Sequence, residues 1–223
     1  MKISLSRRAA SEFLGTGFLV AAIVGSGIMA ERLSGGNIAL ALLANTIATG
    51  AALVALILSF RPISGAHLNP VVSLAEGFLG VIAWKEAGIY VVAQIAGGIA
   101  GAASADVMFA LPAFSASHHA RTGAPQWFSE IVATFGLIMV IQSCARFERA
   151  LLPFAVACYI VAAYWFTSST SFANPAVTIA RSLSDTFAGI RPADVPEFIA
   201  AQLAGGFLAV FVFDWLSPKS NEN

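Results

Sequence analysis

Six long apolar runs, separated by short polar segments, dominate the hydrophobicity pattern of the chain. Each run is close to the roughly 20 residues that an α-helix needs to cross a hydrocarbon core of about 30 Å. The pattern therefore predicts an all-α membrane protein, a single compact domain with six transmembrane helices. The runs cover residues 13–30, 38–59, 88–111, 128–144, 150–166 and 197–216.

Two shorter apolar segments, 69–78 and 174–184, interrupt this series, and each opens on Asn-Pro. Proline is favoured at the first helical position, and asparagine before it is a favoured cap. About ten residues of helix rise roughly 15 Å, half of a hydrocarbon core. Broken backbone at that depth survives only where protein covers it or where it lines a wet cavity. We therefore predict two re-entrant half-helices beside a pore.

The composition fits a chain surrounded by a lipid bilayer. Of its 223 residues, 58% are hydrophobic and only 11% are charged, whereas a soluble domain averages about 25% charged residues. Residues 1–30 have the basic start and apolar core of a signal peptide, but Glu12 stands at the beginning of that core, where an acid is rare. We expect this segment to remain as the first transmembrane helix.

The positions of the basic residues predict the orientation. With a cytoplasmic N-terminus, eight of them fall on the inner side and four on the outer side. This excess matches the positive-inside tendency, so we expect a multi-pass protein of the cell (inner) membrane with both termini cytoplasmic. The inner set is Lys2, Arg7, Arg8, Arg61, Lys85, Arg146, Arg149 and Lys219, and the outer set is Arg32, Arg121, Arg181 and Arg191.

Three sequence markers recur in the same order. SEFLGTGFL at 11–19 corresponds to SEIVATFGL at 129–137, the two Asn-Pro pairs correspond to each other, and QIAGG at 94–98 corresponds to QLAGG at 202–206. The chain therefore consists of two similar halves. Three spans per half make the second half run upside down relative to the first, and inverted repeats of this kind place a solute site near the bilayer midplane.

We assign these repeats to residues 1–111 and 127–217, with a polar, structureless loop at 112–126 and a C-terminal tail at 218–223. The two half-helix starts would then meet at the centre of a pore. Each start carries about half a positive charge, which repels cations. If each Asn carbonyl caps its helix, the amide is left to face neutral solutes, and the approach segments GAHL at 65–68 and SFA at 171–173 line the path with carbonyl oxygens.

Other chemistries find little support. Cys144 and Cys158 lie in apolar runs, so we interpret them as small buried side chains and not as a disulfide or metal site. His118 and His119 lie in the inter-repeat loop, where a solvated pair is favoured over a metal site. The chain has no nucleotide-binding, zinc or hydrolase motif. We therefore expect no enzymatic activity, no cofactor, no metal and no nucleic-acid partner.

SGAHLNPVVS and SFANPAVTIAR, with the repeated Glu and Gln-x-x-Gly-Gly elements, resemble the aquaporin (major intrinsic protein) family over essentially the whole chain. The resemblance implies a homotetramer with one pore per subunit and passive conduction of water or small neutral solutes. It implies that Glu12 and Glu130 hold the re-entrant loops, although an acid within a membrane is also a candidate proton relay, and that His67 lies beside the inner half of the pore. The implied constriction is Asn69, Pro70, Val71, Asn174, Pro175 and Ala176, and the approach segments add Gly65, Ala66, Leu68, Phe172 and Ala173.

The sequence departs from the family pattern at two places. Val71 replaces alanine in the first Asn-Pro-Ala box. After the second box, most aquaporins have an arginine in a narrow outer selectivity filter, and this chain has Val177. Counting back from the boxes without gaps puts the other filter positions at Thr49, Ala162 and Ser171. We therefore predict a small, uncharged and wide ring that admits polyols or hydroxides bulkier than water.

Arg181 lies one helical turn beyond Val177 on the same face, about 6 Å nearer the outer mouth. Its side chain either leans back toward the filter or forms an exposed ion pair with Asp185. Both alternatives are open from the sequence.

The predicted function is passive conduction of small neutral solutes. The resemblance to bacterial family members that lack the filter arginine implies the uncharged trihydroxide arsenite as the leading solute, with glycerol and water also permeating. A general pore for water, glycerol and urea is the first alternative. An ion-coupled secondary transporter also uses inverted repeats and broken helices. That alternative needs a coupling carboxylate in the path, for which Glu12 and Glu130 are the candidates.

Overall fold

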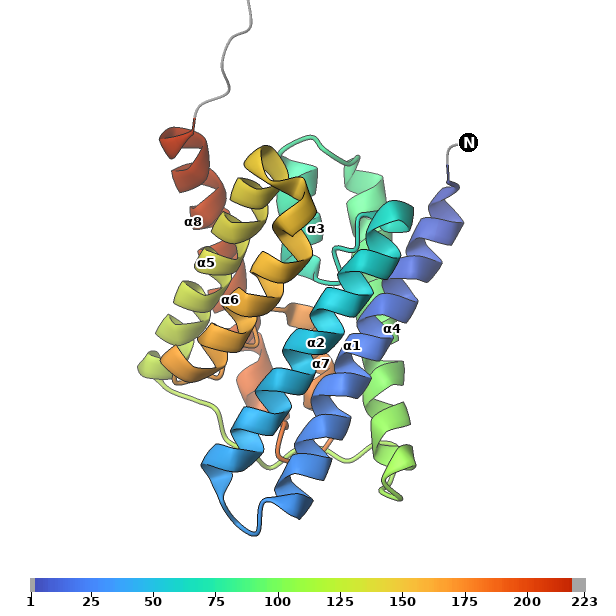
Figure 1. Cartoon of the computed structure of the whole chain (residues 1–223), viewed down its shortest axis with the longest axis vertical. Helices are drawn as coiled ribbons and strands as arrows, with labels where there is room; N and C mark the ends of the chain where they lie inside the picture. The colour runs from blue at the N-terminus through green and yellow to red at the C-terminus, as the bar shows by residue number, and fades with distance from the viewer. Residues whose placement is uncertain (1–2, 218–223) are drawn as a thin grey trace, which may run out of the picture.

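The computed structural model describes residues 3–217 as an all-helical bundle (Figure 1). Lys2, Lys219 and the tail assigned to 218–223 lie outside the described residues. The long helices are α1 (Leu5–Leu33), α2 (Ile38–Ser64), α4 (Trp84–Met108), α5 (Ala124–Phe147), α6 (Leu152–Phe166) and α8 (Val195–Leu216). The short elements are the half-helices α3 (Pro70–Phe78) and α7 (Pro175–Arg181) and the 3₁₀ turns η1 (Arg149–Leu151) and η2 (Pro192–Asp194).

Six segments are long and apolar enough to cross a membrane, which confirms the predicted number of spans. The largest difference in a span is at the first helix, which begins at Leu5 instead of residue 13. The second half-helix is shorter than predicted and ends at Arg181 instead of residue 184. It ends there because the next two amides turn back to bond three residues earlier, Ser182 to Ile179 at 3.2 Å and Leu183 to Ala180 at 3.1 Å.

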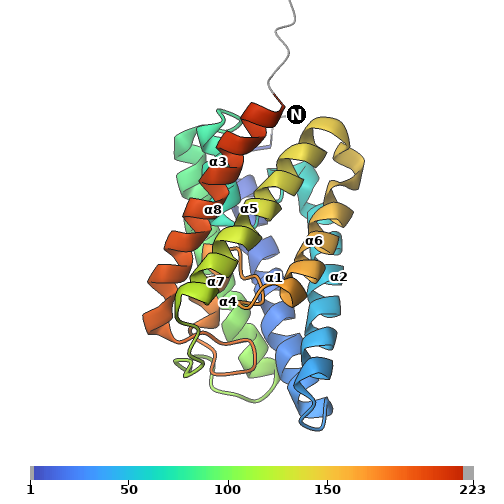
Figure 2. The ribbon, with the colours of Figure 1, turned by 90° about the vertical axis from the view of Figure 1, so that its left-hand side faces the viewer.

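Glycine lets the helices within each half approach closely. Gly97 of α4 lies against the α1 backbone at Phe13, and Gly205 of α8 lies in the same way against Ile131 of α5, where a Cβ would collide with a carbonyl oxygen. Small residues at such contacts are typical of membrane helix pairs. α1 packs on α2 and α4, α5 packs on α6 and α8, and α2 contacts α6 between the halves (Figures 1 and 2).

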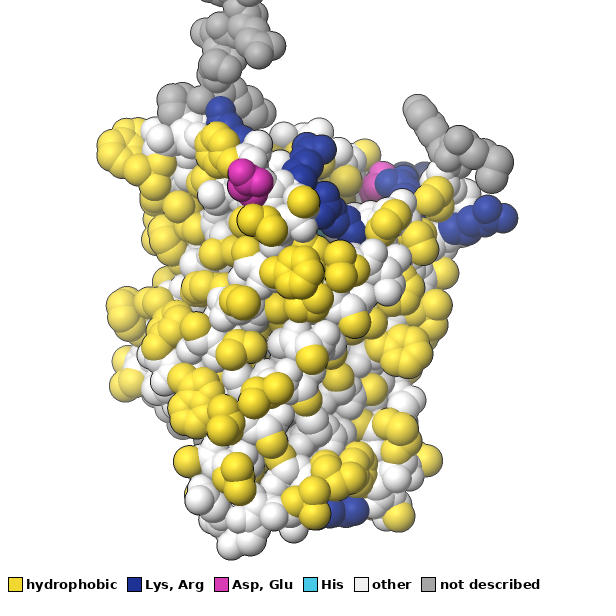
Figure 3. All heavy atoms as spheres, viewed as in Figure 1, with side chains coloured by type: hydrophobic (Ala, Val, Ile, Leu, Met, Phe, Trp, Pro, Cys, Tyr) yellow, Lys and Arg dark blue, Asp and Glu magenta, His cyan; other side chains and the backbone are white. Residues whose placement is uncertain are grey.

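The two half-helices extend toward opposite ends of the bundle. In Figure 1, α3 runs toward the end where α1 begins and α8 finishes, here called the inner end, whereas α7 runs toward the other, outer end. Most of the basic side chains visible in Figure 3 lie at the inner end, and apolar side chains cover the flank. Phe18 of α1, Val92 of α4 and Phe211 of α8 are each about 60% or more exposed, as expected of an integral membrane protein whose helices face lipid.

Candidate functional site

The loop that enters α3 is held by one buried carboxylate. Glu12 of α1 is fully buried and accepts two backbone hydrogen bonds, from His67 N at 3.0 Å and Leu68 N at 2.7 Å. Two side chains also donate to it, Ser64 Oγ at 2.6 Å and Gln94 Nε2 at 2.8 Å. Four donors on one carboxylate compensate its burial, so Glu12 anchors the loop as the family resemblance implies.

The loop that enters α7 is held in the same way. Glu130 of α5 is fully buried and accepts from Phe172 N at 2.9 Å and Ala173 N at 2.8 Å. Ser169 Oγ and Gln202 Nε2 complete the set, each at 2.6 Å. The two sets correspond donor by donor, which is the inverted repeat of the fold expressed in hydrogen bonds.

These carboxylates hold a backbone that would otherwise be unfavourable. Ala66 and Leu68 have φ values of 51° and 48°, and the matching Ser171 and Ala173 have φ values of 50° and 47°. Left-handed backbone costs a non-glycine residue about 1–2 kcal/mol. It persists here because the amides that follow these turns are bonded to buried acids. All four of these residues line the central cavity.

Both asparagines cap their half-helices as predicted. Asn69 Oδ1 accepts from Val71 N at 2.9 Å. Asn174 Oδ1 accepts from Ala176 N at 3.0 Å and from Val177 N at 3.3 Å. The carbonyl oxygen of each side chain is therefore committed to its helix, and only the amide nitrogen remains for other partners.

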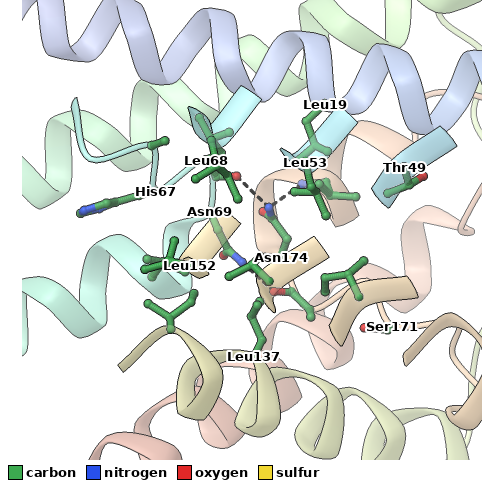
Figure 4. Close-up of a pocket in the computed structure, with 18 of the residues that line it drawn as sticks. Leu19, Thr49, Leu53, His67, Leu68, Asn69, Leu137, Leu152, Ser171 and Asn174 are labelled. Atoms are coloured by element: carbon green, nitrogen blue, oxygen red, sulfur yellow. Dashed lines mark hydrogen bonds between the residues drawn. The ribbon is translucent and has the colours of Figure 1, made fainter. Parts of the chain in front are cut away.

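The amides also join the two loops, which the sequence analysis missed. Asn69 Nδ2 donates to the Ala173 carbonyl at 2.7 Å. Asn174 Nδ2 donates to the Leu68 carbonyl at 2.8 Å (Figure 4). Each NH₂ group has two hydrogens, so one N–H per asparagine remains for a solute. The prediction that the whole NH₂ group of each asparagine faces the pore is therefore corrected: only one of its two N–H bonds remains for the pore.

A cavity of about 330 Å³ passes this pair of asparagines. In Figure 4, His67 lies on one side of the pair and Thr49 and Ser171 lie on the other. The predicted residues that line the cavity are Thr49, Gly65, Ala66, His67, Leu68, Asn69, Ser171, Phe172, Ala173, Asn174, Val177 and Arg181. The predicted residues outside the lining are Pro70, Val71, Pro175 and Ala176, which are buried in the half-helices, the anchors Glu12 and Glu130, and Ala162.

The prediction for Ala162 is wrong. This residue is exposed on the outside of α6, and α6 presents Val156, Ile160 and Tyr164 to the cavity at every fourth position. Residue 162 stands about 200° around the helix from Ile160, because each residue turns by about 100°. Tyr164 takes its place and donates a hydrogen bond from Oη to Thr49 Oγ1 at 3.4 Å. The spacing of four residues between these cavity-lining positions is present in the sequence, but a gap-free count from the Asn-Pro box does not take it into account.

Arg181 also lines the cavity, so the predicted uncharged ring is corrected. Its side chain is 2% exposed, its Cζ lies 3.4 Å from the ring centroid of Phe172, and its Nε donates to the Ala188 carbonyl. Its Nη1 is buried, and no described residue forms a hydrogen bond with it. The alternative pairing with Asp185 is wrong, because Asp185 binds His118 instead.

The predicted loop at 112–126 is ordered over the outer end. Ser115 N and Ser117 N donate to carbonyls of the segment after α7 at 2.8 and 3.0 Å. His118 donates to Asp185 from its backbone N at 2.8 Å, and its Nδ1 lies 2.9 Å from the other carboxylate oxygen. These bonds hold the pKa of Asp185 below its usual range. Arg121 adds hydrogen bonds to the carbonyls of Gly189 and Ser169. Sequence periodicity gave no signal for these long-range bonds.

His67 lies beside the cavity on the inner side of the asparagine pair (Figure 4). Its Nδ1 lies 3.1 Å from Ser73 Oγ, and its ring meets the edge of Tyr90 at 5.3 Å between centroids. Ser73 in turn accepts from Gln94 Nε2 at 2.8 Å, so the imidazole is connected to the hydrogen bonds of Glu12. The ring is therefore fixed beside the path, where the family resemblance placed it.

Comparisons with known proteins agree with this geometry. The sequence model of the family described as Major intrinsic protein matches residues 1–153. Aquaglyceroporin AqpS of Rhizobium meliloti (strain 1021) is 54% identical over 215 residues, 96% of this chain and 92% of AqpS. Aquaporin NIP6-1 of Arabidopsis thaliana is 32% identical over 150 residues, 66% of this chain and 48% of that protein.

The fold is also similar to a solved structure. The X-ray structure of the aquaglyceroporin from Plasmodium falciparum superposes with a TM-score of 0.70 at 20% identity, covering 95% of this chain and 96% of that one. Together with two re-entrant half-helices in inverted repeats, these similarities show that the chain belongs to the major intrinsic protein family and has the aquaporin fold.

Proposed function

We propose that this protein is a passive channel for small neutral solutes, conducting water, glycerol and the uncharged trihydroxide arsenite. The observation that carries the proposal is the cavity that passes between two helix starts, each with one unused asparagine N–H. Partial positive charge at both starts opposes cations, and the free N–H groups suit solutes with lone pairs. The 54% identical relative is named an aquaglyceroporin, which supports glycerol as a solute.

Polar atoms at the outer end support a hydroxylated solute. Ser171 Oγ and Arg181 Nη1 are both buried without a hydrogen-bond partner in the described part of the chain, and both residues line the cavity. Thr49 and Tyr164 add two hydroxyls on the facing helices. Val177 offers no polar side-chain atom and leaves room beside them. Arsenite and glycerol each present three hydroxyls over a similar size, so donors and acceptors in this arrangement fit either.

The arrangement of the buried acids favours a channel over an ion-coupled transporter. Coupling needs a carboxylate that a cation can reach from the path. Glu12 and Glu130 are outside the cavity lining, and every one of their carboxylate oxygens already accepts two hydrogen bonds. Removing a donor to admit a cation would leave a buried charge undercompensated.

The proposed setting is the cell (inner) membrane, with both termini cytoplasmic. Basic side chains at the inner end support this orientation (Figure 3). A homotetramer with one pore per subunit follows from the resemblance to aquaporins. Apolar side chains on the flank are compatible with either lipid or a neighbouring subunit.

Uptake into proteoliposomes tests the transport class. Rates of water, glycerol and arsenite entry should follow only the gradient of each solute and saturate weakly. Imposed proton or sodium gradients should leave the rates unchanged. A rate that tracks either ion gradient would reject the channel in favour of coupled transport. Water entry without glycerol or arsenite entry would reject the proposed solutes.

A further inference from the structure

A second cavity lies at the inner end, behind the wall of the central one. It measures about 460 Å³ and lies among the end of α3, the last turns of α5 and the end of α8. Glu76, Val81 and Ala145 line both cavities. The two spaces therefore share one wall, and Glu76 is the only acidic residue described in that wall. We call the second space the side cavity.

Gln142 on α5 contributes a hydrogen-bond donor that the protein leaves unused. The side chain lines the side cavity and is only 8% exposed, yet its Nε2 has no hydrogen-bond partner among residues 3–217. Buried amide donors are almost always bonded in folded proteins, because an unbonded one loses its hydration without replacement. An acceptor in the side cavity would satisfy this group.

Opposite charges stand on either side of that donor. Arg149 of η1 also lines the side cavity, and its Nε donates to the Ala145 carbonyl at 2.8 Å. Glu76 is half-buried and has no side-chain hydrogen bond or ion pair within residues 3–217. Arg146 and Asp214 line the side cavity as well. The side cavity thus offers an amide donor and two cations from α5 and η1, and carboxylates from α3 and α8.

We propose that the side cavity binds phosphoethanolamine, either free or as a lipid headgroup. The phosphate, with several acceptor oxygens, would meet Gln142 Nε2 and the Arg149 guanidinium together, and the ammonium would meet Glu76. Because Glu76 also lines the central cavity, occupancy changes the charge at the inner mouth of the pore. This effect on flux rests on the proposed channel function, whereas binding itself does not.

Calorimetric titration of the full-length protein in a phosphate-free maltoside detergent tests the binding. Free phosphoethanolamine should bind saturably, and Gln142→Leu or Arg149→Ala should each weaken it about tenfold, the usual loss for a hydrogen bond to a charged group. Arg7→Ala is the matched control, because Arg7 is an exposed cation at the same end, and its affinity should not change. Absence of saturable binding, or affinity unaffected by both cavity variants, overturns the site.

The ammonium contact has its own test. Phosphocholine carries a methylated ammonium without N–H groups, so it should bind the natural protein more weakly than phosphoethanolamine does. Glu76→Gln should abolish that difference. If Glu76→Gln still prefers phosphoethanolamine over phosphocholine as strongly as the natural protein does, the assignment of Glu76 is overturned.

Binding in lipid nanodiscs distinguishes free phosphoethanolamine from the phosphoethanolamine headgroup of a lipid as the ligand of the side cavity. If the headgroup fills the side cavity, free phosphoethanolamine should bind less tightly in phosphatidylethanolamine nanodiscs than in phosphatidylcholine nanodiscs, and equal affinities assign the site to the free compound. In liposomes with phosphoethanolamine on both sides, water entry should slow for the natural protein and not for Glu76→Gln. If phosphoethanolamine binds but water entry does not slow, the proposed effect of binding on flux is overturned. If the protein conducts no water at all, the proposed channel function is rejected, and the calorimetric titration still tests the binding site.

Discussion

The guanidinium of Arg181 stacks on the ring of Phe172, with Cζ 3.4 Å from the ring centroid, and both side chains line the central cavity. A bond from Nε to the Ala188 carbonyl fixes the same guanidinium from a second direction. Val177, where most family members have arginine, is apolar. The outer end of this pore nevertheless carries a fixed positive charge, supplied from one helical turn further out.

Replacing Arg181 by alanine should increase leak of cations. A unit charge held about 5 Å from the path in an environment of intermediate dielectric raises the barrier for a cation by about 3 kcal/mol, and screening reduces this toward 1 kcal/mol. Potassium leak should therefore rise about tenfold, and glycerol flux should rise less. Liposome flux assays measure both. Arg32→Ala is the control, because Arg32 is exposed at the same end, and a leak equal to that of Arg32→Ala would remove Arg181 from the barrier.

Val177→Arg should narrow the outer end and add a second cation beside Arg181. Val177 is 3% exposed and lines the cavity, so the longer side chain has to enter the path. Glycerol and arsenite permeability should fall about tenfold or more, and water permeability should fall less because water is smaller. Light scattering on one liposome preparation gives both rates. An unchanged ratio of glycerol to water permeability would contradict this assignment of residue 177.

Asn69→Asp and Asn174→Asp should reduce neutral-solute flux and admit some cations. Aspartate keeps the cap acceptor but replaces the amide that donates to the opposite loop, so an oxygen would face the carbonyl of Ala173 or Leu68. The lost hydrogen bond and the new repulsion together cost about 2–4 kcal/mol. Thermal unfolding should therefore show a lower transition temperature in both variants. If folded variants keep the natural glycerol and arsenite permeability, these asparagines do not govern the path.

Glu130→Gln should destabilise the loop that enters α7. The amide nitrogen of glutamine is a donor, so at least one of the present donors loses its acceptor, at a cost of about 1–3 kcal/mol. Glu12→Gln should have a similar effect, because Glu12 accepts from an equivalent set. Both variants should unfold at lower temperature in detergent, whereas the exposed Glu31→Gln should not. A transition temperature as high as that of Glu31→Gln would show that the carboxylates are dispensable.

Features set by local sequence could be predicted. The six spans follow from apolar length, and the half-helices follow from Asn-Pro followed by a short apolar segment. The anchoring role of Glu12 and Glu130 followed from the family resemblance and their recurrence. In each case the physical cause lies within a few residues or in a pattern that appears twice.

Features set by contacts between distant segments could not be predicted. The direction of Arg181 depends on Phe172 and Ala188, which approach it only in the fold. Tyr164 takes the place predicted for Ala162 because the segment between the cavity-lining position of α6 and Asn174 is two residues shorter than a gap-free count assumes. The inter-repeat loop is held by backbone bonds to the segment after α7, and such bonds leave no periodicity in the sequence.

The reciprocal bonds of Asn69 and Asn174 determine when the centre of the protein can form during synthesis. The Ala173 carbonyl that accepts from Asn69 is made more than a hundred residues after that asparagine. A nascent chain that has released only the first repeat can already place Leu68 against Glu12, but its asparagine amide has no acceptor from the other loop. The pair of asparagines at the centre of the path therefore cannot be complete until residue 174 has been synthesised.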